Sequence, residues 1–234
     1  MREPLTIAVA QPGTLAMDVA ANALTHAAAI RAADARVVVF PELSLTGYEL
    51  DAPDVDLDDE RLAPIVAACA DTSSTALIGA PVAADGGGSN NALLAVDGSG
   101  VTIAYRKVWV DATEEGRFRP GAAPAVLAVD GWRLGMAICK DTGIARHAAD
   151  TAALGIHAYV AGTLMFDHEI ELQDERARRI ATEHGIPVAF ASFAGPTGGG
   201  YVRTAGNSGI WDAEGAVIAQ VGPEPGSIAR ATLV

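Results

Sequence analysis

Three polar residues stand at or near the ends of apolar runs, and their types could support nucleophilic chemistry. Cys139 ends the run GMAIC, Glu42 follows VVVFP, and Lys107 lies in AYRKVWV. Strand ends are where open α/β sheets hold their sites. A thiol needs a base to remove its proton and a cation to stabilise negative charge on the substrate. A partly desolvated glutamate can act as that base, so the three residues could together produce a thiolate nucleophile.

Each of these residues also has an ordinary structural explanation. A glutamate after a strand is commonly a solvated cap, and a lysine between apolar residues commonly extends its amine to water. A cysteine at a strand end is commonly part of the core. The second cysteine, Cys69, lies in an Ala-rich helical pattern, and we expect it to be a small buried side chain. The combination of Glu42, Lys107 and Cys139 therefore indicates chemistry more strongly than any one of them.

The segments that must position these residues alternate between helix and strand, with hairpins in the middle of the chain. Continuous β-branched runs are typical of strands buried on both faces. Asp97–Gly100 and Asp130-Gly131 predict hairpin turns, since glycine adopts positive φ at little cost. Gly185 and Pro187 predict the end of the longest helix. We expect strands within residues 5–11, 36–43, 75–82, 90–110, 124–139, 156–162, 186–193, 207–221 and 226–234, and helices within 14–35, 58–72, 143–155 and 166–185.

Two stacked mixed sheets with helices on their outer faces would bury all of these apolar runs. No repeat period, linker or low-complexity tract divides the chain, so we expect one domain over residues 1–234. The stretch GPTGGGY at 195–201 lacks the Lys-Ser/Thr of a P-loop and the spacing of a dinucleotide fingerprint. We interpret it as a mobile loop.

The net charge of −13 argues against polyanionic partners. Sixteen basic residues face 29 acidic ones, so nucleic acid would be repelled on average. Two cysteines far apart in the sequence are typical of free thiols in a reducing compartment, and MREPLTIAVAQPG lacks the apolar core of a signal peptide. No apolar stretch approaches the length that crosses a bilayer. We expect a cytoplasmic protein with no nucleic-acid or membrane partner.

Several stretches resemble the nitrilase superfamily of carbon-nitrogen hydrolases in their order and approximate spacing. They are VVVFPELSLTGYEL, then YRKVWV followed by EEGRFRPG, and then RLGMAICKD. IAVAQP resembles the first strand of the superfamily, and NSGIWDAEGAVIAQ resembles a late hairpin, so the resemblance spans nearly the whole chain. The glutamate motif is highly specific and the lysine motif moderately so.

The resemblance implies an α/β fold, namely a four-layer αββα sandwich of two mixed β-sheets flanked by helices. It also implies cleavage of non-peptide C–N bonds through a thioester on the protein. In this assignment Glu42 would be the general base, Cys139 the nucleophile, and Lys107 the cation that stabilises the tetrahedral oxyanion. The backbone N–H of Lys140 would also donate to that oxyanion.

The superfamily has a second, supporting glutamate that would orient Lys107 and the substrate. Counting back from Phe118 and Pro120 selects Glu114, whereas counting forward from Lys107 also suits Glu115. We prefer Glu114. For whichever glutamate is not used, the ordinary interpretation is an exposed loop acid.

The residues after Cys139 depart from the pattern of many members, which have an aromatic residue there and an aromatic-Pro-Glu sequence downstream. Here Lys140 follows, then Asp141 and TGIARHAAD, so the departure concerns the substrate pocket rather than the three central residues. We take Lys140, Asp141 and Tyr48 as substrate-binding candidates. Further candidates are Glu171 and Arg178, from a helix whose cluster Arg176, Arg178 and Arg179 could supply one cation for a substrate carboxylate.

Histidines offer the main competing chemistry. The five histidines are scattered, and none forms H-x-x-x-H or lies at metal-ligand spacing from a cysteine, so we expect no metal site. A dyad of Cys139 with His147 is compatible with the spacing. His147 lies in a predicted helix, however, where a surface or capping role is commoner.

These observations predict a cysteine-dependent hydrolase of small amides or N-carbamoyl compounds that releases ammonia or an amine and a carboxylic acid. We expect no cofactor, and a homodimer or higher homo-oligomer. One alternative is a nitrile-cleaving enzyme, although the Trp-Glu-Asn continuation common after the cysteine of such relatives is absent. The other is a non-catalytic binding or scaffold protein with the same fold.

Overall fold

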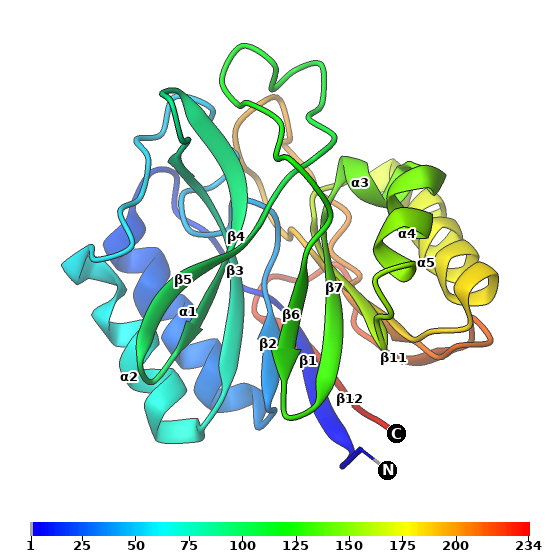
Figure 1. Cartoon of the computed structure of the whole chain (residues 1–234). Helices are drawn as coiled ribbons and strands as arrows, with labels where there is room; N and C mark the ends of the chain where they lie inside the picture. Colours follow the sequence, from blue (N-terminus) through cyan, green and yellow to red (C-terminus); the bar gives the residue numbers. More distant parts are fainter. Residues whose placement is uncertain (1) are drawn as a thin grey trace.

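Two six-stranded sheets are stacked face to face, and helices cover their outer faces (Figure 1). The computed structural model describes residues 2–234. The strands are β1 (Leu5–Gln11), β2 (Val37–Val39), β3 (Thr75–Ala83), β4 (Ser89–Asp97), β5 (Gly100–Arg106), β6 (Val126–Val129), β7 (Trp132–Ile138), β8 (Ala158–Thr163), β9 (Val188–Ser192), β10 (Gly209–Trp211), β11 (Val217–Gln220) and β12 (Ser227–Leu233). The helices are α1 (Val19–Ala33), α2 (Ala63–Thr72), α3 (Lys140–Gly143), α4 (Ala145–Ala152) and α5 (Ile170–His184), with 3₁₀ turns η1 (Glu60–Leu62) and η2 (Asp167–Glu169).

The two sheets have the same internal topology. One has the order β12-β1-β2-β3-β4-β5, and the other has the order β11-β10-β9-β8-β7-β6. In the first, β1, β2 and β3 are parallel to one another, and the remaining neighbours are antiparallel. In the second, β7, β8 and β9 form the parallel part. Each parallel part is connected through helices, as parallel strands require. The two sheets therefore share one pattern of parallel and antiparallel neighbours, although the antiparallel neighbour of β1 is the last strand of the chain and that of β7 directly precedes it.

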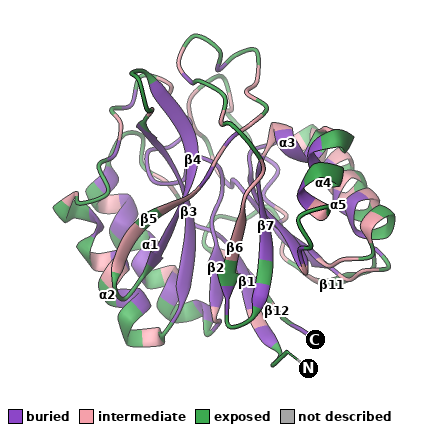
Figure 2. Ribbon diagram, in the orientation of Figure 1, coloured by how far each residue is buried: buried purple, intermediate pink, exposed green. Residues whose placement is uncertain are grey.

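Three apolar layers hold the sandwich together. The central layer lies between the sheets and contains the alternate residues Ile7 and Val9 of β1 with Met136 and Ile138 of β7. A second layer lies between the first sheet and helices α1 and α2, and a third between the second sheet and helices α4 and α5. Figure 2 shows buried residues running along the strands and exposed ones on the outer helix surfaces. The four-layer αββα architecture predicted from the sequence is confirmed.

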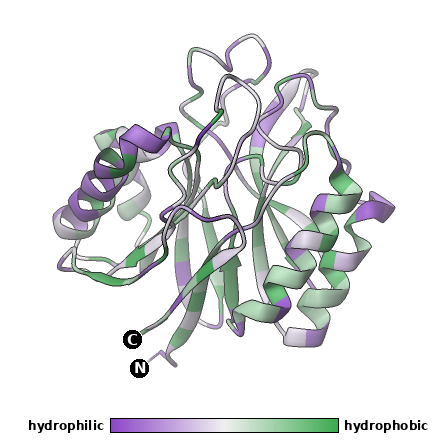
Figure 3. Cartoon of the chain, turned by 180° about the vertical axis from the view of Figure 1, so that it is seen from behind, coloured by the Kyte–Doolittle hydropathy of each residue, from purple (hydrophilic) through white to green (hydrophobic). Residues whose placement is uncertain are grey.

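Local sequence signals account for some of the helix ends. Asp18 caps α1, because its side chain accepts a hydrogen bond from the N–H of Ala21 at 3.0 Å. Gly185 ends α5 in the left-handed conformation. In Figure 3 the Ala-rich helices α1 and α2 are mostly pale to green, whereas the charged α5 carries purple residues. In the part of the chain described, no helix has both the length and the apolar character needed to cross a membrane.

Two expected segments differ in detail. The run 36–43 is a strand only over Val37–Val39, since Phe40 and Pro41 leave the sheet. The helix expected within 143–155 starts at Ala145, and the separate turn α3 precedes it directly after Cys139. The glycine-rich stretch 195–201 packs on the body of the protein, because Thr197 Oγ1 accepts a hydrogen bond from the N–H of Tyr48 at 2.8 Å. The mobility expected of this stretch stays a prediction.

The turn that follows β2 passes between the two sheets, and a glycine from each sheet makes room for it. A Cβ on Gly79 of β3 would lie 2.3 Å from the backbone nitrogen of Leu43. A Cβ on Gly162 of β8 would lie 2.7 Å from the carbonyl oxygen of Phe40 and 2.9 Å from the nitrogen of Glu42. No real Cβ approaches a main chain this closely, so both positions require glycine for reasons of space.

Replacing either glycine with alanine should push the turn at Glu42 out of place. We expect Gly79→Ala and Gly162→Ala each to lower the free energy of unfolding by at least the roughly 1–3 kcal/mol typical of overpacking, because the obstruction is backbone and cannot rotate away. Denaturant unfolding measures the loss. Gly222→Ala is the matched control, since a Cβ there meets no atom within 4 Å. Wild-type stability of both variants would show that the turn is not held in this way.

Candidate active site

A buried ammonium group lies between two buried carboxylates at the centre of the site. Lys107 Nζ is 2.6 Å from Glu42 Oε1 and 2.7 Å from Glu114 Oε2. All three side chains are at most 1% exposed. The amide of Asn91 on β4 donates to Glu42 Oε1 at 2.9 Å and to Glu114 Oε1 at 3.2 Å. Each carboxylate therefore has both a cation and a neutral donor as partners.

The backbone on both sides of Lys107 is fixed by hydrogen bonds. Its N–H donates to the carbonyl of Asn91 at 2.8 Å, and its carbonyl accepts from the N–H of Gly121 at 2.7 Å. Glu114 is fixed by the N–H of Asp111, which donates to Oε2 at 2.9 Å. Glu115, the alternative left open by the sequence, is exposed. The structure thus places Glu114, and not its neighbour, beside Lys107.

Cys139 stands at the end of β7 in a strained backbone conformation. Its φ is 37° and its ψ is −91°, outside the regions that non-glycine residues ordinarily occupy. Such strain is found preferentially at functional positions, where the surrounding structure enforces it. The N–H of Cys139 donates to the carbonyl of Gly162 at 2.9 Å, and the Sγ donates to the carbonyl of Leu164 at 3.1 Å. Both contacts tie the cysteine to β8 and the residues after it.

Glu42, Lys107 and Cys139 line one small cavity of about 210 Å³. Its wall comes from both sheets, from the start of α3 and from α5. The lining residues are Glu42, Tyr48, Lys107, Asp111, Cys139, Lys140, Leu164, Met165, Glu169, Arg176 and Tyr201. Three residues that are distant in the sequence therefore share one pocket.

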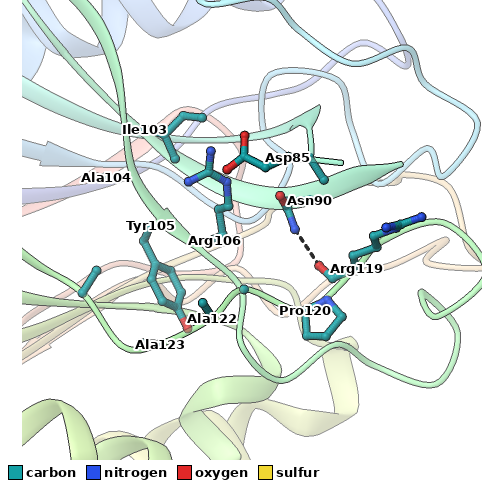
Figure 4. A pocket seen from close by; sticks show the side chains of 13 residues that line it. Asp85, Asn90, Ile103, Ala104, Tyr105, Arg106, Arg119, Pro120, Ala122 and Ala123 are labelled. Atoms are coloured by element: carbon teal, nitrogen blue, oxygen red, sulfur yellow. Dashed lines mark hydrogen bonds between the residues drawn. The ribbon is translucent and has the colours of Figure 1, made fainter. Parts of the chain in front are cut away.

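A larger cavity of about 460 Å³ lies elsewhere, between β5 and residues 119–125 (Figure 4). None of the three central side chains lines it. Asn90 there donates to the carbonyl of Arg119 at 2.8 Å, while the guanidinium groups of Arg106 and Arg119 point in different directions. Because its charged groups do not converge, this cavity is a poorer candidate for chemistry than the smaller one.

Burial sets the direction of the pKa shift for Glu42 and Cys139, whereas neighbouring negative charge sets it for Lys107. Burial raises the pKa of Glu42 to about 7, although the charge of Lys107 opposes the shift. For Lys107, burial alone would lower the pKa, but the negative charges of Glu42 and Glu114 outweigh it and raise the pKa well above its usual value. Burial, and then the charge of Glu42, raise the pKa of the Cys139 thiol. The raised pKa favours the thiol form of Cys139, beside a carboxyl group whose pKa is near 7, which agrees with the expectation that a base must remove the thiol proton.

The family assignment agrees with this arrangement. A model of the family described as carbon-nitrogen hydrolase matches residues 6–234. The chain belongs to the carbon-nitrogen hydrolase family. A curated relative, the hydrolase in the pqqF 5' region of Pseudomonas protegens, is 30% identical to it over 215 residues, which cover 88% of this chain and 75% of the relative.

Solved structures from the nitrilase superfamily share the fold of this carbon-nitrogen hydrolase. The amidase of Nesterenkonia AN1 matches with a TM-score of 0.86 at 22% identity, covering 98% of this chain and 90% of that one. Nit3 of Saccharomyces cerevisiae matches with a TM-score of 0.86 at 20% identity, covering 99% of this chain and 90% of that one. The predicted membership of the superfamily is confirmed.

Of the predicted substrate-binding residues of this hydrolase, Tyr48 and Lys140 line the cavity and Asp141 does not. Lys140 Nζ pairs with Asp111 Oδ2 at 3.0 Å. Asp141 is fully buried, and its carboxylate accepts hydrogen bonds from the N–H groups of Trp109 and Ile138, both at 2.9 Å. These bonds join the segment after Lys107 to the segment that carries the cysteine. The placement favours a structural role for Asp141 over contact with substrate.

The expectation of a surface or capping role for His147 is wrong. The side chain is 1% exposed, and both ring nitrogens are engaged, Nε2 with the hydroxyl of Tyr105 and Nδ1 with that of Tyr159, each at 2.9 Å. Tyr105 also donates to Asp141 Oδ2 at 2.8 Å. A histidine occupied in this way is a poor partner for a dyad with Cys139. Among residues 2–234 no cluster of three or more His, Cys, Asp or Glu side chains is arranged to hold a metal ion.

Helix α5 turns different residues toward the cavity than those singled out from the sequence. Glu171 and Arg178 are exposed, and Arg178 pairs with Asp174 on its own helix at 3.5 Å. Arg176 lines the cavity instead, as does Glu169 just before α5. Sequence reasoning also missed Asn91, whose polar side chain within the apolar run NNALLAV was the available signal. The lining residues Leu164, Met165 and Tyr201 carry no such signal.

Removing the central ammonium should destabilise the protein in a pH-dependent way. Lys107→Met leaves two buried carboxylates without a cation, and such changes cost about 3–5 kcal/mol. The pKa of Glu42, already raised to about 7, should rise further, so the folded protein holds protons more tightly than the unfolded chain. The loss should therefore be largest above neutral pH and shrink as the pH falls toward the ordinary range of glutamate.

Urea unfolding across this pH range measures the effect of Lys107→Met. The control is Lys140→Met, because the Lys140–Asp111 pair is well exposed and should contribute less than about 1 kcal/mol. Equal losses for the two variants at every pH would contradict the description of Lys107 as the counter-ion of buried carboxylates.

Proposed function

We propose that this carbon-nitrogen hydrolase cleaves the C–N bond of small amides or N-carbamoyl compounds through a thioester on Cys139. One observation carries the proposal: the carboxylate of Glu42, the ammonium of Lys107 and the sulfur of Cys139 line the same small cavity. This set provides a base, a stabilising cation and a nucleophile, the three functions that thiol-dependent acyl transfer requires. Glu114 and Asn91 are positioning residues, because they hold Lys107 and Glu42 in place.

The first step transfers the thiol proton as the new bond forms. The sulfur of Cys139 attacks the carbonyl carbon of the substrate, and its proton passes to Glu42. Since the pKa of Glu42 is about 7, much of the enzyme has the carboxylate form at neutral pH and can accept that proton. The raised pKa of the thiol keeps the sulfur protonated until a substrate is present.

The carbonyl oxygen becomes an oxyanion in the tetrahedral intermediate, and the pocket offers two donors for it. Lys107 carries a positive charge in a site largely closed to water, where electrostatic stabilisation is strong. The N–H of Lys140 is the first of α3 and has no acceptor within that helix. In this mechanism the two groups stabilise charge that develops only during the reaction.

Collapse of the intermediate completes acylation, and water completes the cycle. The C–N bond breaks as protonated Glu42 returns its proton to the leaving nitrogen, which departs as ammonia or an amine. Glu42, again a carboxylate, takes a proton from a water molecule that attacks the thioester carbon. The C–S bond then breaks as protonated Glu42 returns the proton to the sulfur, and the acid leaves, a carboxylic acid from an amide or a carbamic acid from an N-carbamoyl compound.

The structural relatives support an amide as substrate. Structures of the Nesterenkonia amidase include a complex with butyramide and a covalent addition of the acetamide moiety of fluoroacetamide at the active-site cysteine. By analogy, we propose an amide rather than a nitrile as the substrate of this chain. A screen for ammonia release from amides, ureido acids and nitriles tests this choice, and turnover of nitriles alone would overturn it.

Substituting the proposed nucleophile should abolish turnover without unfolding the protein. We expect Cys139→Ala to release no ammonia and to form no acyl adduct detectable by mass spectrometry. Cys69→Ala is the control, because Cys69 is buried in α2, away from the cavity. An adduct on Cys69, or full activity of Cys139→Ala, would exclude the mechanism. Absence of any turnover or adduct in the wild type would instead favour a non-catalytic binding protein.

The proposed base predicts the pH dependence of the reaction. Since Glu42 must be deprotonated to accept the thiol proton, kcat/KM should rise with pH through a midpoint near 7. Glu42→Gln should lower kcat/KM by about 100- to 10,000-fold, the usual contribution of general base catalysis. Steady-state rates between mildly acidic and mildly alkaline pH measure both effects. A flat wild-type profile across neutrality would show that Glu42 is not the titrating base.

A further inference from the structure

Arg176 is a charged residue of the cavity that has no carboxylate partner. Its neighbours on α5 are engaged: Arg178 pairs with Asp174, and Arg179 donates to the carbonyl of Thr142 at 2.8 Å. For Arg176, the hydrogen-bond contact observed is with the sulfur of Met165 at 3.8 Å. Within residues 2–234 no Asp or Glu oxygen lies within 4.0 Å of its guanidinium. The positive charge therefore faces the cavity without a counter-ion from the described chain.

The fold makes space for this guanidinium beside the nucleophile segment. A Cβ at Gly143 would lie 3.0 Å from Cζ of Arg176 and 3.1 Å from Nη2. Gly143 is the last residue of α3, which begins directly after Cys139. The glycine thus lets the planar head of Arg176 pack against the turn that follows the nucleophile.

The other cations of the cavity are already paired. Lys107 contacts Glu42 and Glu114, and Lys140 contacts Asp111. Glu169 also lines the cavity, and its Oε2 accepts a hydrogen bond from the N–H of Phe166 at 2.9 Å. A partly buried guanidinium without an anion is costly, so an anionic group placed there by a ligand would be favoured.

We propose that Arg176 binds a carboxylate of the substrate, so that the preferred substrates are short amido acids or N-carbamoyl amino acids. This inference rests on the function proposed above. Guanidinium and carboxylate groups form two parallel hydrogen bonds, which fix orientation as well as affinity. The carboxylate at Arg176 directs the amide at the other end of the molecule toward Cys139. A cavity of about 210 Å³ is small for a ligand site, which favours a short substrate.

An acid of the cavity itself is the alternative partner for Arg176. Of the acids that line the cavity, Glu42 and Asp111 each pair with a lysine, whereas Glu169 accepts a hydrogen bond from the N–H of Phe166 and is the remaining acid beside Arg176 in the lining. If Glu169 is the true partner of Arg176, Glu169→Gln should reduce selectivity as much as Arg176→Gln does. If a substrate carboxylate is the partner, Glu169→Gln should leave or increase the preference for anionic substrates.

Matched substrates separate charge recognition from catalysis. Initial rates of ammonia release would be compared for succinamate, glutaramate and N-carbamoylglycine, each against the neutral analogue in which a methyl ester replaces the carboxylate and no second C–N bond is added. We expect the wild type to prefer the anionic member of at least one pair. Arg176→Gln should reduce that preference roughly 10- to 100-fold, as expected for hydrogen bonds to a charged group. Arg176→Lys should retain part of it.

The control variant is Arg178→Gln, which removes an exposed guanidinium from the same helix and should keep the wild-type preference. A second measurement does not depend on turnover of the anionic substrate: glutarate should inhibit hydrolysis of a neutral amide competitively, with a Ki that rises in Arg176→Gln. Equal activity of the wild type on anionic and neutral members, or an unchanged preference in Arg176→Gln, would overturn the inference. No ammonia release from any amide by the wild type would overturn the proposed function itself.

Discussion

The site depends on one buried ammonium group that two carboxylates share. Without Lys107, Glu42 and Glu114 would face each other as like charges in a region with little water, and the pKa of Glu42 would rise further. With Lys107 present, their negative charge is balanced enough for the pKa of Glu42 to settle near 7 instead of far above it. The same contacts hold the ammonium at a defined place beside the cysteine. The contacts among Glu42, Lys107 and Glu114 therefore fix both the charge balance of the pocket and the position of the ammonium group.

The two sheets supply different parts of this arrangement. In the first sheet, Glu42 lies in the turn after β2, Lys107 directly follows β5 and Asn91 lies within β4. Cys139 directly follows β7 of the second sheet. Gly79 and Gly162 let the Glu42 turn pass between the sheets, and the Asp141 carboxylate links the segment after Lys107 to that after Cys139. Backbone contacts rather than flexible side chains thus set the distance between acid, amine and sulfur.

Much of this could be predicted from the sequence, because the apolar runs and turn signals define the strands and because the three central residues stand at strand ends. Other features depend on contacts between distant segments. His147 lies in a polar helix, and its burial depends on hydrogen bonds to Tyr105 and Tyr159, which come from other parts of the chain. The choice of Arg176 over Arg178 depends on the rotation of α5, which the burial of Ala177 and Ile180 fixes. The strained φ of Cys139 likewise has no signal in its residue type.

The turn that carries Glu42 lies between the sheets, so Glu42, Lys107 and Cys139 come together only when both sheets have formed. A folding intermediate with only the second sheet formed would contain the cysteine but neither the base nor the ammonium. Long-range contacts of this kind form late, after the local hairpins and helices. The proposed nucleophile therefore meets the proposed base and the ammonium only once both sheets have come together.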